Sequence, residues 1–141
     1  MQRQEIVALF SRRQAAWDRL DADELAAGHE EDGRVESPLA GGTVVGREAI
    51  GKLYRTYFSA FSDLRLAQDE LLIDGDRVVL LGRVSGTDTG GFMGMAPTNR
   101  AVSVPVVFFY ELHGGRIRRE RRVYDFTGVL VQVGLLKTKP V

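Results

Sequence analysis

The stretch that decides the fold is IRRERRVYDFTGVLVQVGLL, residues 117–136. Its first half places arginines among apolar and aromatic residues and indicates a strand, whereas its second half indicates a short apolar helix. A single carboxylate, Asp125, stands between the two and is flanked by Tyr124 and Phe126. We therefore interpret the rest of the chain as the wall and lid of a cavity around Asp125.

Asp125 is the principal candidate for a catalytic residue. Side chains alternate between the two faces of a strand, so Asp125 is expected to share a face with Arg121 and Val123. In an apolar pocket, burial raises the pKa of a carboxyl group and suits it to proton transfer near neutral pH. Two structural interpretations compete with this one: Asp125 pairs with Arg121, or it caps the following helix at Thr127 and Gly128.

The first half of the chain is mainly helical in pattern. Asp21 or Asp23 can cap a short helix, and a strand is expected over residues 32–38, followed by a glycine-rich loop over residues 40–46. Apolar residues recur at helical spacing in the remaining segments. The predicted helices cover residues 2–20, 21–28 and 46–61.

After Phe61 the apolar pattern changes to the alternation that is typical of strands. The pair Asp74-Gly75 predicts a hairpin turn, and residues 113–115 turn the chain into its last strand. Helices that precede a run of antiparallel strands indicate the α+β class. We expect a single domain over residues 1–141.

Two strand segments are apolar on both faces, namely residues 78–81 and 104–110. An antiparallel sheet with one face in water should instead alternate apolar and polar residues. Because few elements remain to cover a second face, we expect a second copy of the chain to cover it, in a homodimer.

Composition excludes several classes of protein. The formal net charge is zero, which argues against nucleic acid as a partner. The chain has no cysteine, so disulfides and zinc–sulfur sites are excluded, and no His, Asp or Glu residues have the spacing of metal ligands. No apolar run is long enough to span a membrane, and the amphipathic start does not resemble a secretory signal. We expect a cytoplasmic protein with neither a metal nor a membrane partner.

Three motifs carry a resemblance to a known family. They are GREAI at residues 46–50, TGGFMG…PT within residues 89–98, and the segment 115–136 with Asp125, Gln132 and Gly134. Together with the order of the elements, they make the chain resemble the SnoaL-like polyketide cyclases of the nuclear transport factor 2-like superfamily. The resemblance implies a curved antiparallel sheet, wrapped into a cone around a hydrophobic pocket that the N-terminal helices close.

The resemblance also implies an activity and a site. It implies cofactor-independent acid/base chemistry on a lipophilic carbonyl compound, such as ring closure by an intramolecular aldol reaction, with Asp125 as the acid/base. Relatives with known activity tend to carry a histidine two residues before the acid, where this chain has Val123. The expected substrate-binding residues are Trp17, Glu36, Tyr54, Tyr57, Phe92, Met95, Arg121 and Val123.

Other functions stay open on the same residues. Isomerisation or dehydration would use the same pocket, and the Arg-X-Asp spacing at Arg121 also resembles epoxide hydrolases of this superfamily, for which Glu36 could serve as a second carboxylate. A different class is a non-catalytic binding protein in which Asp125 only orients an apolar ligand. A third is an interaction module built on the outer face of the sheet.

Overall fold

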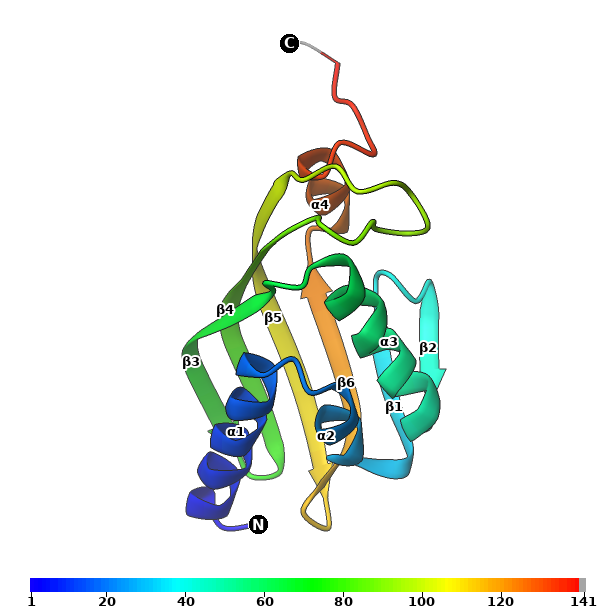
Figure 1. The fold of residues 1–141 in the computed structure, drawn as a ribbon. Coiled ribbons are helices and arrows are strands. Elements are labelled where there is room, and N and C mark those ends of the chain that lie inside the picture. Colours follow the sequence, from blue (N-terminus) through cyan, green and yellow to red (C-terminus); the bar gives the residue numbers. More distant parts are fainter. Residues whose placement is uncertain (140–141) are drawn as a thin grey trace.

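The computed structural model describes residues 1–139 and shows helices packed on one face of a curved sheet (Figure 1). The helices α1, α2 and α3 precede most of the strands, and α4 follows the last one, which confirms the predicted α+β class. Their bounds are α1 Arg3–Asp18, α2 Ala22–Ala27, α3 Arg47–Ala60 and α4 Phe126–Gln132. None of these helices is both long and apolar enough to cross a membrane.

Six strands form one sheet in the order β2-β1-β6-β5-β4-β3. Their bounds are β1 His29–Ser37, β2 Gly42–Val45, β3 Arg65–Asp74, β4 Arg77–Thr87, β5 Ala101–His113 and β6 Arg116–Tyr124. The sheet departs from the expected antiparallel arrangement at one place, because β1 pairs with β6 in parallel. The expected loop over residues 40–46 is also wrong in part, since Gly42–Val45 pairs with β1 as an edge strand.

Both predicted hairpin turns are present. The β3–β4 turn contains Gly75, and Asp74 pairs with Arg77. The β5–β6 turn is Gly114-Gly115. All three glycines have positive φ angles, 59° at Gly75, 57° at Gly114 and 79° at Gly115. Two-residue hairpin turns need this left-handed backbone region, which glycine enters without a steric cost.

The helices cover one face of the sheet and bury the core there. On β5, the residues at even positions from Val102 to Leu112 are buried and the intervening ones are more exposed. This alternation is the pattern expected of a strand that packs on helices on one side only. Asp21 caps α2, since its carboxylate accepts a hydrogen bond of 3.0 Å from the Glu24 N–H.

A β-bulge in β6 decides which side chains face the core. Ile117 pairs with Leu112 and Arg119 with Glu111, so Arg118 is an extra residue without a partner in β5. An extra residue reverses the alternation of faces. Ile117 is therefore buried upstream of the bulge, whereas Glu120 is among the buried residues downstream of it.

Candidate functional site

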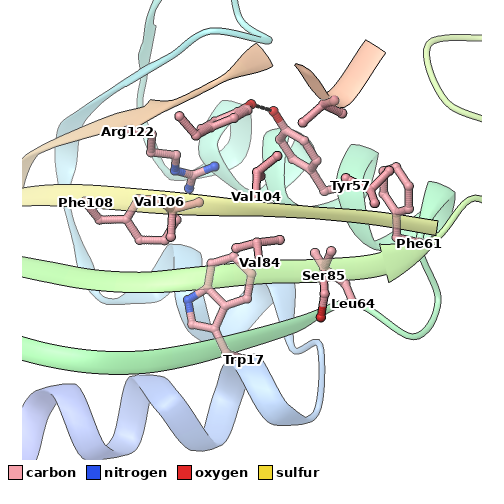
Figure 2. Close-up of a pocket in the computed structure, with 13 residues that line it drawn as sticks. Trp17, Tyr57, Phe61, Leu64, Val84, Ser85, Val104, Val106, Phe108 and Arg122 are labelled. Atoms are coloured by element: carbon pink, nitrogen blue, oxygen red, sulfur yellow. Dashed lines mark hydrogen bonds between the residues drawn. The ribbon is translucent and has the colours of Figure 1, made fainter. Parts of the chain in front are cut away.

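A small apolar cavity lies between the helices and the sheet (Figure 2). It contains about 50 Å³ of free space. Its wall combines residues from α1, α3, α4 and three strands. The lining residues are Trp17, Tyr57, Phe61, Leu64, Val84, Ser85, Val102, Val104, Val106, Phe108, Arg122, Tyr124 and Val129.

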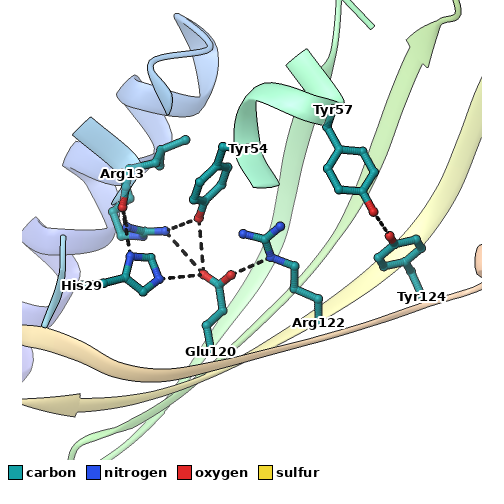
Figure 3. Close-up of polar contacts among 8 residues, drawn as sticks. Arg13, His29, Tyr54, Tyr57, Glu120, Arg122 and Tyr124 are labelled. Carbon is teal, nitrogen blue, oxygen red and sulfur yellow. Dashed lines mark hydrogen bonds and ion pairs between the residues drawn. The ribbon is translucent and has the colours of Figure 1, made fainter. Parts of the chain in front are cut away.

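Two tyrosine hydroxyls meet in the wall of this cavity. Tyr57 comes from α3 and Tyr124 from the end of β6, and their hydroxyl groups are in direct contact (Figures 2 and 3). Burial, with Tyr124 next to it, raises the pKa of Tyr57 well above its usual value. The Tyr57 phenol therefore stays protonated at neutral pH and can donate a hydrogen bond to an oxygen in the cavity.

A buried ionic cluster lies beside the cavity, centred on Glu120 (Figure 3). The Arg122 Nε atom donates to Glu120 Oε2 at 2.6 Å, and the Tyr54 hydroxyl is 3.4 Å from Glu120 Oε1. Arg13 Nη2 and His29 Nε2 lie 3.6 Å and 3.7 Å from the same oxygen. Elements from both ends of the chain thus converge on one carboxylate.

Electrostatics keep this cluster ionised. Burial by itself would raise the pKa of Glu120, but Arg122, His29 and Arg13 outweigh it and hold that pKa well below the usual range. Burial and the negative charge of Glu120 raise the pKa of Tyr54, so this phenol stays neutral. Glu120 is therefore a carboxylate with fixed partners, as expected of a buried ion pair that holds elements together.

Arg122 joins the ionic cluster to the cavity. Its Nε atom is bound to Glu120, and its guanidinium lies 4.5 Å from the centre of the Tyr54 ring. Arg122 is buried and lines the cavity, yet among residues 1–139 its Nη2 atom has no hydrogen-bond partner. Buried donors are usually satisfied, so an unpaired one in a cavity wall marks a place where a ligand or water can bind.

Asp125 does not take the interior position that we expected. Its side chain is exposed and caps α4, where its Oδ1 atom accepts a 2.8 Å hydrogen bond from the Gly128 N–H. The expected orientation is wrong because the bulge at Arg118 reverses the alternation along β6. The capping interpretation agrees with the structure, and the structure lends no support to Asp125 as the acid/base.

Several other predicted residues lie in or near the cavity. Trp17 and Tyr57 line it, whereas Tyr54 is fully buried in the ionic cluster next to it. Phe92 is buried behind the wall, with its ring 5.9 Å from the Tyr57 ring and 5.3 Å from the Phe61 ring. These aromatic residues thus form the part of the predicted site that the fold does bring together.

The remaining predicted residues lie elsewhere. Val123 is 62% exposed and Met95 is 56% exposed, so neither contacts the cavity. Glu36 accepts hydrogen bonds from Arg119 and Arg121 on the outer face of the sheet. The expectation that these four residues line the apolar cavity is therefore wrong, because three of them project from the opposite face of the sheet and Met95 from the surface of a loop.

That loop, residues 88–100, is held by a buried carboxylate. Asp88 accepts hydrogen bonds from the Gly91 N–H at 3.0 Å and from the Thr98 N–H and hydroxyl at 3.2 Å and 2.9 Å. Both ends of the loop are thereby tied to one side chain. Asp88 is consequently a structural residue of the loop.

Arg122 and Tyr124 line the cavity but are not among the site residues predicted from the sequence. Strand alternation correctly puts both on the face opposite to Arg121 and Val123. Val123 is the more apolar side chain in this region and therefore suggested the wrong face as the buried one. The bulge that decides the matter leaves no local signal in the sequence. No group of potential metal ligands occurs among residues 1–139.

Comparisons with known proteins agree with this architecture. AclR from Streptomyces galilaeus, a proposed hydroxylase, superposes with a TM-score of 0.83 at 29% identity, covering 99% of this chain and 91% of that one. TsrD from Streptomyces laurentii has a TM-score of 0.83 at 24% identity, over 96% and 99% of the two chains. IdmH from Streptomyces antibioticus, a proposed polyketide cyclase, has a TM-score of 0.75 at 21% identity, over 91% and 97%.

None of the curated proteins compared with this chain matches it significantly. The family model for the SnoaL-like polyketide cyclases, however, matches residues 8–133, which is most of the chain. The matched segment includes every element that lines the cavity, from Trp17 in α1 to Val129 in α4. The chain therefore belongs to the SnoaL-like polyketide cyclase family.

Proposed function

We propose that this protein is an enzyme that converts a lipophilic carbonyl compound of polyketide type without a cofactor. The reaction we favour is ring closure by an intramolecular aldol reaction, and isomerisation is a close alternative. The observation that carries the proposal is the pair of tyrosine hydroxyls, Tyr57 and Tyr124, that meet in the wall of a mainly apolar cavity. Membership of the family supports the same class of reaction.

The tyrosine pair suits the last step of an aldol closure. A carbon between two carbonyl groups loses its proton to solvent readily, and the resulting enolate carbon attacks the carbon of a third carbonyl group in the same molecule. A carbon–carbon bond forms, and the oxygen of that third carbonyl becomes an alkoxide. The Tyr57 hydroxyl donates its proton to that alkoxide and regains one from water, as general acids do.

The free volume of the cavity sets a condition on this reaction. Pockets for small organic ligands commonly measure about 300–1,000 Å³, whereas this cavity holds about 50 Å³. A substrate therefore requires lining side chains to move apart. Tyr57 belongs to α3 and Tyr124 to β6, and no backbone hydrogen bond of the sheet joins them, so their separation would enlarge the cavity without breaking the sheet.

Ligand binding can be followed with the only tryptophan of the chain, Trp17, because it lines the cavity. The probe is 1,8-dihydroxyanthraquinone, a neutral lipophilic molecule with two ring carbonyls. We expect saturable quenching of Trp17 fluorescence in the unmodified protein. Val104→Phe adds bulk inside the cavity and should abolish the quenching. Val123→Phe makes the same change on the outer face and should leave it intact.

Quenching that survives Val104→Phe would place the probe outside the cavity and contradict the proposal. Turnover is tested with nonane-2,4,8-trione, in which the carbon between two carbonyl groups can attack the third carbonyl and close a six-membered ring. Loss of a general acid typically lowers a rate about 10²–10⁴-fold, so Tyr57→Phe should slow this closure by that order. A trione that binds and stays unchanged would instead favour a non-catalytic binding protein.

A further inference from the structure

We infer that the natural ligand of this cavity carries a carboxylate, and that Arg122 binds it. This inference rests on the proposed function and names a chemical feature of the substrate that an apolar cavity alone would not require. Arg122 would be a specificity-determining residue, since it would select an anionic ligand over a neutral one of the same shape. Two independent observations lead to it.

The first observation is the balance of buried charge (Figure 3). Two guanidinium groups, on Arg13 and Arg122, share a single carboxylate, on Glu120. Their side chains are 6% and 3% exposed and that of Glu120 is 1% exposed, so water screens none of them well. Within this cluster, one positive charge is thus left without a carboxylate partner among residues 1–139. A carboxylate in the adjacent cavity would neutralise it and would form a charge-assisted hydrogen bond.

The second observation is the direction of the free donors. Glu120 occupies the Nε side of Arg122, and the terminal nitrogens point away from Glu120 toward α3 (Figure 3). Nη2 is buried and has no partner among residues 1–139. Arg122 also lines a surface pocket at the β1–β2 turn. The carboxylate of Glu36 lines this pocket too, but it is already bound by Arg119 and Arg121.

Arg122 therefore lies between the surface pocket and the inner cavity. A ligand with its apolar body in the cavity could reach the guanidinium with an acidic group at one end. The fork of an arginine binds a planar carboxylate more specifically than a lysine does, because it offers parallel donors. An ordered water could satisfy Nη2 as well, but it would leave the surplus charge uncompensated.

The test compares 2-naphthoate with 2-naphthamide by titration calorimetry at pH 7. The two probes have nearly the same size and shape and differ in charge. We expect the unmodified protein to bind naphthoate roughly tenfold or more tightly than the amide. Arg122→Met should remove this preference. Arg121→Met is the matched control, because Arg121 directly precedes Arg122 in β6 but projects from the outer face. In this variant the preference for naphthoate should persist.

Arg122→Met leaves Glu120 with fewer partners, and the variant can fail to fold for that reason. The triple variant Arg13→Met, Glu120→Gln, Arg122→Met removes both guanidinium groups together with the carboxylate that they share, and it serves as the second test, with its fold checked by circular dichroism. It should bind the two probes with equal affinity. A preference for naphthoate that survives in either folded variant would overturn the inference.

Equal binding of the two probes by the unmodified protein, or no binding of naphthoate, would also overturn it. The proposed function is judged separately, by the quenching of Trp17 with the neutral anthraquinone. Saturable quenching by that dye together with no preference for naphthoate would support the proposed function and contradict the further inference, because the substrate would then be apolar and uncharged. Absence of both signals would contradict both proposals.

Discussion

Replacing Glu120 with glutamine should destabilise the protein strongly, although the substitution preserves size and shape. The carboxylate of Glu120 is the shared partner of Arg122 at 2.6 Å and of Arg13 at 3.6 Å. In Glu120→Gln, both guanidinium groups stay buried and charged, with an amide in place of the only carboxylate between them. Two positive charges then face each other where water cannot screen them.

The expected magnitude follows from this geometry. Removing one partner of a buried ion pair typically costs about 3–5 kcal/mol, because the other charge is left uncompensated. For a domain of this size, each kcal/mol lowers the melting temperature by about 3 °C. Glu120→Gln should therefore melt roughly 10–15 °C below the unmodified protein. Urea unfolding should show a lower midpoint with an unchanged slope.

Glu36→Gln is the matched control for this measurement. Glu36 also accepts hydrogen bonds from two arginines of β6, Arg119 and Arg121, but its side chain is 33% exposed on the outer face. Ion pairs in contact with water contribute about 0–1 kcal/mol, so this variant should melt close to the unmodified protein. Equal losses from Glu120→Gln and Glu36→Gln would refute the view that burial makes the Glu120 cluster essential.

Three further predictions follow from the same structure. The pKa of Glu120 is lowered in the folded state, so its ionised form stabilises the protein at pH values above its unfolded pKa of about 4.5, and this stabilisation is lost as the pH falls below 4.5. The difference in free energy of unfolding between the unmodified protein and Glu120→Gln, measured with urea, should therefore be constant from pH 7 to about pH 5 and should shrink at lower pH. Asp125→Ala should lower the free energy of unfolding by about 0.5–2 kcal/mol because the cap of α4 is lost. Asp125→Asn should change that free energy little and leave turnover intact, and a large loss of turnover in this variant would restore the catalytic interpretation. An apolar row on the outer face runs across three strands and consists of Leu81, Val107 and Val123, so we expect a homodimer to form there. In light scattering, the unmodified protein should give the mass of a dimer and Val107→Lys that of a monomer.

Local features of the fold could be predicted because their causes lie in neighbouring residues. Helical spacing of apolar side chains predicted α1 and α3, and the carboxylates of Asp21 and Asp23 were the two candidates for the cap of α2, of which Asp21 is the cap. The turn at Gly75 followed from the need for a positive φ angle. The cap at Asp125 was also available as an interpretation, since a carboxylate before a short helix can bind the N–H groups of its first turn.

The edge strand Gly42–Val45 could not be predicted in the same way. It is short and glycine-rich at its start, and it is a strand only because β1 offers it a partner, with Val35 opposite Val44. Pairing of this kind depends on the position of another segment in space. Local propensity therefore indicated a loop where the tertiary structure forms a strand.

The candidate site depended most on the tertiary structure. Within β6, the sequence separates Glu120, Arg122 and Tyr124 from Arg121 and Val123 by simple alternation, and this division is correct. Which of the two sets faces the core is decided by the bulge at Arg118, and that bulge arises from the pairing of β6 with β5. A one-residue shift of register moves every following side chain to the other face.

The buried charges show the same dependence. Nothing near Glu120 in the sequence indicates that Arg13, from the first helix, will pack against it. An arginine-rich strand by itself is typical of a solvated surface, and the side chains of Arg119 and Arg121 are indeed partly exposed to water. Arg122 is buried because α1 and α3 cover this face of the sheet, and the opposite charge of Glu120 offsets the cost of removing its guanidinium from water. The sequence thus indicated every helix and all strands except Gly42–Val45, whereas the packing of these elements decided which charges became part of the interior.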